Sequence, residues 1–109
     1  MPACAVSPEK MAQDANYQAE IELFFADREL QKLNYRDPAY APLMAIYDQA
    51  LIEWTKADHY LNWTSTGAGS ADQAIYNIAR AVRFFTRCQA LARQVYESLV
   101  PPPTKPEEL

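Results

Sequence analysis

Glycine is almost absent from this chain, and the little that it has lies in one place. Among its 109 residues only Gly67 and Gly69 are glycine, both inside the segment NWTSTGAGSADQ at residues 62–73. Half of the residues, 50%, are hydrophobic and 22% are charged. This composition disfavours a disordered chain and a turn-rich β-sandwich. We therefore expect a globular helical protein whose long reversal lies in this segment.

Three helix starts are marked by the local sequence. Serine and aspartate side chains accept hydrogen bonds from the free N–H groups of a first turn, and proline suits the first helical position. The three combinations are Ser7 with Pro8, Asp37 with Pro38, and Ser70 with Gln73, the last at capping-box spacing. They predict helices over residues 8–33, 38–63 and 71–99.

The predicted fold is all-α, with three long helices in an up-down-up antiparallel bundle that self-association completes. A chain of this length suits one domain. We assign residues 1–100 to a single helical-bundle domain and residues 101–109, PPPTKPEEL, to an extended proline-rich tail. Pro42 either falls in the first turn of the second helix, where proline is tolerated, or moves that start a few residues later.

The second and third predicted helices differ in how much apolar surface they need to bury. Residues 38–63 form one apolar stripe on a helical wheel. Residues 71–99 are apolar over an arc of roughly 200°, which is wider than one neighbouring helix can cover. We expect the third helix to contact two partners and to keep its arginine-bearing side in water.

The first predicted helix has two opposed apolar faces. One is a stripe with alanine at every seventh position, which permits close helix packing: Ala12, Ala19, Leu23, Ala26, Leu30 and Leu33. The other carries Tyr17, Ile21, Phe24 and Phe25. A large side chain left exposed forgoes roughly 1.5–3 kcal/mol. Either this helix is central in the bundle, or a second chain covers the aromatic face, which is the candidate interaction face.

Arg80, Arg83 and Arg87 form a basic ridge on the third helix at i, i+3 and i+7 spacing. We take them as candidate rim or partner contacts. The ridge is either solvated or paired within the chain, or it meets an acidic protein partner or a nucleic acid. The formal net charge of −4 disfavours nucleic acid, as does the presence of Tyr76 alone among aromatic residues on that side.

Asp58 and His59 are the only residues that suggest acid–base chemistry. His59 is the single histidine and projects away from the apolar stripe. Asp58 falls within that stripe and is our candidate buried polar residue, which would need a hydrogen-bond donor. A structural hydrogen bond for Asp58 and a solvated His59 are the alternatives to catalysis. We assign no catalytic residue.

Metal and cofactor chemistry is not indicated by the sequence. Cys4 and Cys88 are the only cysteines, which is too few for a disulfide framework or a tetrahedral zinc site, and we expect them to be reduced. The helices contain no Glu-x-x-His motif of the kind that builds a di-metal bundle. We predict no metal and no cofactor.

The glycine-containing segment is better explained as a bend than as a site. It has no lysine and no P-loop pattern, so a phosphate cradle is not supported. Its sequon at Asn62 has no secretory signal to accompany it, and no apolar stretch is long enough for a membrane span. We expect a cytoplasmic protein without membrane association.

These observations favour a non-catalytic protein–protein interaction module: a small adaptor, regulator or inhibitor of a larger assembly. Its partner would be itself, as a homodimer, or another protein, because closed twofold contacts readily cover a self-complementary patch. One alternative is a helical bundle that binds a small apolar ligand among its aromatic residues. Another is a small enzyme that uses Asp58 and His59.

Overall fold

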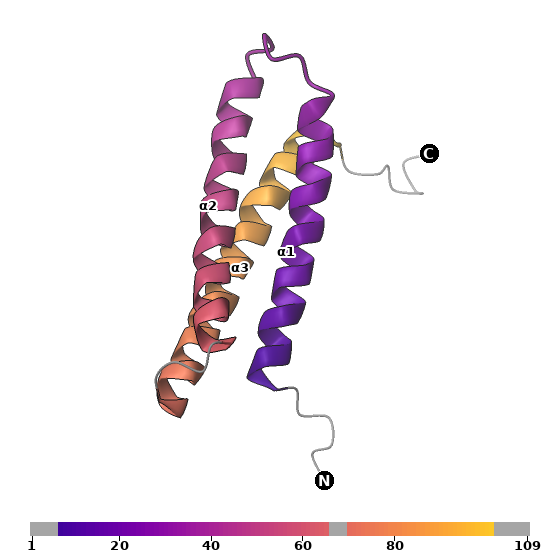
Figure 1. The fold of residues 1–109 in the computed structure, drawn as a ribbon. Coiled ribbons are helices and arrows are strands. Elements are labelled where there is room, and N and C mark those ends of the chain that lie inside the picture. The colour runs from indigo at the N-terminus through magenta and orange to yellow at the C-terminus, as the bar shows by residue number, and fades with distance from the viewer. Residues whose placement is uncertain (1–6, 66–69, 102–109) are drawn as a thin grey trace, which may run out of the picture.

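The protein folds into three long antiparallel helices. The computed structural model describes residues 7–65 and 70–101, which form α1 (Pro8–Gln31), α2 (Tyr40–Ser65) and α3 (Ala71–Leu99). The chain runs up α1, down α2 and up α3 (Figure 1), and the described residues contain no strand. The predicted all-α, up-down-up bundle is confirmed, and every helix end lies within two residues of its predicted position.

The starts of α1 and α3 are capped by serine, as the sequence predicts. The Ser7 hydroxyl accepts a hydrogen bond from the Lys10 N–H at 3.2 Å. The Ser70 hydroxyl accepts one from the Gln73 N–H at 3.1 Å. Each serine therefore satisfies a backbone donor that the first helical turn leaves without a partner.

The start of α2 lies two residues later than predicted. The Asp37 carboxylate accepts from the Ala39 N–H at 2.9 Å, and the Asp37 carbonyl accepts from the Tyr40 N–H at 2.9 Å. This turn delays the helix to Tyr40. Pro42 then falls in the first turn, where its missing N–H costs no helical hydrogen bond.

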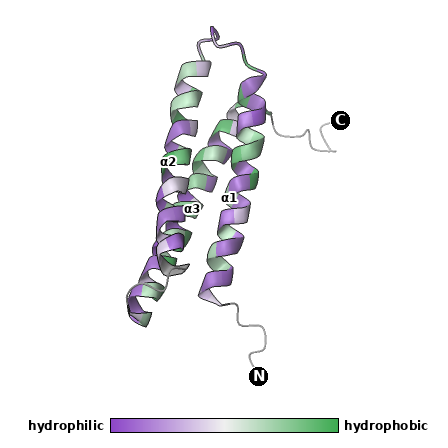
Figure 2. Cartoon of the chain, viewed as in Figure 1, coloured by the Kyte–Doolittle hydropathy of each residue, from purple (hydrophilic) through white to green (hydrophobic). Residues whose placement is uncertain are grey.

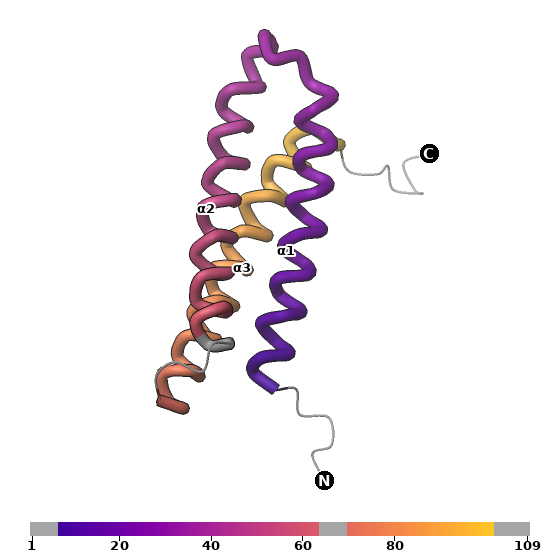
Figure 3. The backbone as a smooth tube through the Cα atoms, viewed as in Figure 1, coloured from indigo at the N-terminus to yellow at the C-terminus, as the bar shows by residue number. Residues whose placement is uncertain are grey.

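The third helix is the centre of the bundle. α3 packs extensively against both α1 and α2, whereas α1 and α2 contact each other much less. Figures 1 and 3 show α3 starting beside the end of α2 and crossing behind it toward the end of α1. The expectation that the third helix contacts two partners is confirmed. The alternative that the first helix is central is wrong, because only the broad apolar arc of α3 can serve two neighbours.

Small residues line the helix contacts. In Figure 2 hydrophobic and hydrophilic residues alternate along all three helices, as expected where each helix buries one face. The alanines with no exposed surface are Ala12, Ala19, Ala26, Ala50, Ala57, Ala81 and Ala92. The largest fully buried side chains are Phe85, Val95 and Cys88. The seven-residue alanine repeat of α1 is therefore the core face of that helix.

Polar contacts tie α1 to both of its neighbours. The Trp54 indole N–H donates to the Asn16 side-chain oxygen at 2.8 Å, which joins α2 to α1. The Gln89 side-chain amide donates to the Ala15 carbonyl at 3.2 Å, which joins α3 to α1. Such directional hydrogen bonds between partly buried groups fix the register of helices whose buried apolar side chains are mostly small. No helix in the described ranges combines the length and apolar character needed to cross a membrane.

Candidate functional site

The outer face of α1, formed by Tyr17, Ile21, Phe24 and Phe25, lies opposite its buried alanine stripe. Tyr17 and Phe24 are each 63% exposed, Phe25 is 40% exposed, and Ile21 is partly buried. With Glu20, these side chains line a shallow hollow that opens to solvent. The candidate interaction face is thus an apolar surface of the single chain and not part of its core.

Phe25 anchors one edge of this face to α3. Its ring meets Phe24 edge-to-face at 5.7 Å and meets Tyr96 of α3 edge-to-face at 6.1 Å. Beside it, the Arg93 guanidinium donates to the Glu22 carboxylate at 2.7 Å. These contacts hold α1 in one orientation, so that the remaining aromatic side chains point away from the bundle.

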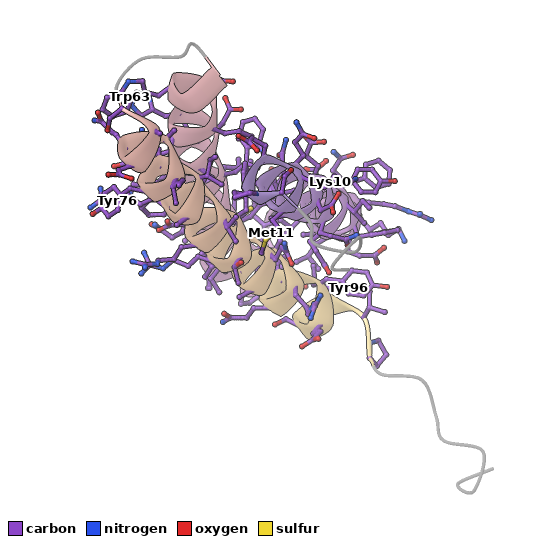
Figure 4. All side chains as sticks on the ribbon, turned by 90° about the horizontal axis from the view of Figure 1, so that it is seen from below. Lys10, Met11, Trp63, Tyr76 and Tyr96 are labelled. Atoms are coloured by element: carbon purple, nitrogen blue, oxygen red, sulfur yellow. The ribbon has the colours of Figure 1, made fainter. Side chains whose placement is uncertain are left out.

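A second exposed apolar area lies where α1 and α3 begin. Met11 and Ile75 are more than half exposed, and Figure 4 places Met11 where the two helices meet. The hollow at this junction has a volume of about 280 Å³. It is lined by Pro8, Met11, Ile75, Ile78, Ala79 and Val82.

Cations lie over aromatic rings along the junction of α2 and α3, in an arrangement that we call the cation–aromatic ladder. Its members are Tyr76, Arg80, Tyr60, Phe84, Lys56 and Arg87. Arg80 donates one hydrogen bond to the Tyr60 hydroxyl at 3.0 Å and another to the Tyr76 hydroxyl. Its guanidinium lies 5.5 Å from the centre of the Tyr60 ring and 4.4 Å from that of Tyr76. These hydrogen bonds, first that to Tyr60 and then that to Tyr76, raise the pKa of Arg80.

The ladder continues through Phe84. The Tyr60 and Phe84 rings stack with centres 5.8 Å apart and planes 4° apart. The Lys56 ammonium lies 5.7 Å from the Phe84 ring centre, and the Arg87 guanidinium lies 5.5 Å from it. The expectation that only Tyr76 accompanies the arginines is therefore wrong, because α2 contributes Tyr60 and the ridge side of α3 contributes Phe84.

The cations of this surface have no carboxylate partner within the described residues. The ion pairs of the described residues join Lys10 with Asp14, Lys32 with Glu29, and Arg93 with Glu22. None of these pairs includes a cation of this surface, that is, Lys56, Arg80, Arg83 or Arg87. Within the chain, Arg80 is therefore paired with two tyrosine hydroxyls and with no carboxylate of the described residues.

Asp58, the candidate buried polar residue, is only partly buried. Its carboxylate accepts a hydrogen bond from the Asn62 side-chain amide at 3.1 Å. The buried carboxylate of α2 is instead Glu53, which is 8% exposed. The reason is that α2 packs mainly on α3 and only lightly on α1, and Glu53 lies on the side near Cys88 of α3, whose pKa its charge raises.

Two buried polar groups escaped prediction from the sequence. Glu53 accepts from the Gln49 side-chain amide at 3.1 Å through one oxygen, while its other oxygen has no hydrogen-bond partner in the structure. The Asn77 side-chain nitrogen is also buried without a partner. Burial, and then the Glu53 charge, raise the pKa of the Cys88 thiol to about 12. The burial of Glu53 could have been predicted from its spacing: it lies three residues after Ala50 and four before Ala57, and residues at these spacings share a helix face.

His59 is exposed, and the Asp58 carboxylate accepts a hydrogen bond from Asn62 and not from His59. The His59 ring lies 5.6 Å from the Tyr60 ring and 6.2 Å from the Trp63 ring. No hydrogen bond joins it to Asp58 in the described part of the chain, where adjacent helical residues point about 100° apart. Among the same residues, no three His, Cys, Asp or Glu side chains form a cluster that could hold a metal ion.

Several sequence-based interpretations concern residues that lie outside the described ranges. These are Cys4, the two glycines Gly67 and Gly69, and the tail beyond residue 101.

No family model, curated protein or solved structure matches this chain. The choice of function therefore depends on the two exposed surfaces themselves: the apolar outer face of α1, and the cation–aromatic ladder between α2 and α3.

Proposed function

We propose that the protein is a non-catalytic interaction module that pairs with a second copy of itself through the outer face of α1. The observation that carries this proposal is the 63% exposure of both Tyr17 and Phe24, directly opposite a fully buried alanine stripe. A large side chain left in water forgoes roughly 1.5–3 kcal/mol of burial energy. Several such side chains on one helix favour a surface that another chain covers.

The order of residues along α1 suits a twofold contact. If two α1 helices pair antiparallel about an axis at Ile21, Tyr17 of each copy meets Phe25 of the other. In the same register Asp14 meets Arg28 of the other copy, and both side chains are exposed in the single chain. Aromatic pairs near the centre with opposite charges at the rim form a self-complementary patch, which a closed dimer requires.

In this account the protein acts by scaffolding or occlusion, as a small adaptor, regulator or inhibitor of a larger assembly. One alternative retains an observation in its favour. The apolar hollow lined by Met11 and Ile75 offers a volume of about 280 Å³ to a small apolar ligand. That hollow lies at the junction of α1 and α3, so ligand binding there and self-association through the outer face of α1 are separable.

The register can be tested by disulfide trapping. An Ile21→Cys variant in a Cys4→Ser background should form a covalent dimer on mild oxidation, because a twofold axis at residue 21 brings the two new thiols within disulfide distance. Buried Cys88 should not compete. The matched control is Ile52→Cys, at an exposed apolar position of α2. If both variants crosslink slowly and to the same extent, the outer face of α1 is not the contact.

A further inference from the structure

The cation–aromatic ladder lies on the opposite side of the bundle from the outer face of α1. In the end-on view of Figure 4, Tyr76 and Trp63 lie on one side of the molecule and Lys10 of α1 points away on the other. Lys10 shares a helix face with Tyr17, which is seven residues later. A partner on the ladder would therefore leave the α1 face free for self-association.

The ladder concentrates positive charge on an acidic protein. With Arg83 added, Lys56, Arg80 and Arg87 carry four positive charges, whereas the whole chain has a formal net charge of −4, so the remaining residues sum to −8. Residues 73–96 of α3 contain four arginines and no acidic residue. A long polyanion would meet the acidic remainder of the surface, whereas a short acidic segment fits within the basic area.

Two of these cations contact the same aromatic ring, and neither has a carboxylate partner among the described residues. Lys56 and Arg87 both approach the Phe84 ring, at 5.7 and 5.5 Å from its centre. Both cations therefore lie within reach of one ligand that sits beside Phe84. A carboxylate there would gain attraction from either cation, since screening in physiological salt acts over about 8 Å.

Further hydrogen-bond donors are available beside these two cations. Arg80 directs hydrogen bonds at Tyr60 and Tyr76 and has other N–H groups to offer. The Tyr76 hydroxyl accepts from Arg80 and keeps its own proton to donate. Arg80 is also held by stacking on both rings, so little side-chain entropy remains to be lost when a ligand binds.

The rings themselves are poorly placed to stack on nucleic-acid bases. Binding of single strands uses aromatic faces on which bases stack. Tyr60 already stacks on Phe84 and has Arg80 over its ring, and Phe84 has Lys56 and Arg87 over its own. The ladder thus presents cations and hydrogen-bond donors where a base-binding surface presents open rings.

From this geometry we propose that the cation–aromatic ladder binds a short acidic peptide segment of a partner protein. Carboxylates of the segment contact Lys56, Arg83 and Arg87, and the Tyr76 hydroxyl and Arg80 donate to the same chain. The hollow formed with Thr55 and His59 beside Phe84 accommodates an apolar side chain of the segment.

The test begins with an unbiased selection. Phage displaying random dodecapeptides are selected on the immobilised full-length protein and counter-selected on an Arg83→Gln/Arg87→Gln variant. Both arginines are exposed, so circular dichroism should show an unchanged fold. We expect the retained peptides to be rich in Asp and Glu. Selection without acidic enrichment overturns the proposal.

Affinity measurements on a selected peptide then separate site binding from general charge attraction. By fluorescence anisotropy with the labelled peptide, Arg83→Gln/Arg87→Gln should weaken binding about tenfold, since exposed charge contacts contribute up to about 1 kcal/mol each. The control Lys32→Gln/Arg36→Gln removes the same charge near the loop between α1 and α2 and should leave the affinity unchanged. Equal weakening by both pairs contradicts a defined site.

Two additional comparisons distinguish the ligand class and the two surfaces. Oligo(dT) of the same length should displace the peptide only at much higher concentration, and displacement at lower concentration would assign the ladder to nucleic acid instead. A Phe24→Glu variant should bind the peptide as the wild type does. If that variant loses the peptide while circular dichroism shows that it stays folded, the ladder is not an independent site, and the proposal is overturned.

Discussion

Two phenylalanines give the sharpest contrast between core and surface in this protein. Phe85 of α3 is fully buried, whereas Phe24 of α1 is 63% exposed. Truncation of a core phenylalanine to alanine costs about 3–5 kcal/mol, because apolar contact is lost and a cavity remains. Full burial of a phenylalanine stabilises by roughly 1.5–3 kcal/mol, so the covered third of Phe24 contributes about 0.5–1 kcal/mol. Phe85→Ala should therefore destabilise the single chain several times more than Phe24→Ala.

Urea unfolding followed by circular dichroism measures both effects. In dilute protein, where the single chain dominates, we expect a loss in the free energy of unfolding of about 1 kcal/mol or less for Phe24→Ala and at least 3 kcal/mol for Phe85→Ala. In concentrated protein the loss for Phe24→Ala should grow, because association stabilises the folded wild type. Equal losses for the two variants at every concentration would instead identify Phe24 as a core residue.

Three further predictions concern the core. The pKa of the Cys88 thiol is raised from 9.0 to about 12 in the folded state, so the unfolded chain loses the thiol proton at lower pH than the folded chain does. The free energy of unfolding therefore falls as the pH rises above 9, by about 1.4 kcal/mol at pH 10. Urea unfolding of Cys88→Ala should show a smaller drop between pH 8 and pH 10, and an equal drop contradicts this assignment. Ala19→Leu should lower the free energy of unfolding by about 1–3 kcal/mol through overpacking, and the melting temperature by several degrees. The exposed control Gln18→Leu should not. Similar melting temperatures for the two variants would mean that α1 does not pack closely at Ala19. Asn16→Leu leaves the Trp54 indole N–H without its acceptor and should cost about 1–2 kcal/mol, with a shift of Trp54 fluorescence in a Trp63→Phe background; unchanged emission would place the indole elsewhere.

Features that depend on local sequence were predictable. Capping by Ser7 and Ser70 needs only residues three positions apart, and the structure has both hydrogen bonds. The alanine repeat of α1 was also readable, because a seven-residue spacing places Ala12, Ala19 and Ala26 on one face whatever they pack against. The two-residue delay of α2 arises from the turn at Asp37, whose side chain and carbonyl compete with the helix for the first donors.

Features that depend on how two helices pack were not predictable from the sequence of each helix alone. Whether Glu53 or Asp58 is buried depends on which side of the α2 stripe α3 covers, and helical periodicity does not determine that rotation. The pairing of Arg80 with Tyr60 likewise requires the register between α2 and α3, 20 residues apart in sequence. A wheel of α3 alone places Phe84 at the edge of its apolar arc, but only the neighbouring helix turns that edge into a stack of rings and cations.

If the outer face of α1 is an interface between two copies of the chain, the molar mass must depend on concentration and on Phe24. Light scattering over a dilution series measures this for the wild type and for Phe24→Glu. We expect a wild-type mass that approaches twice the 12.4 kDa of one chain at high concentration and falls toward 12.4 kDa on dilution. The Phe24→Glu variant should stay folded and remain at 12.4 kDa throughout. A wild type that remains at the mass of one chain at every concentration would show that this face is not such an interface.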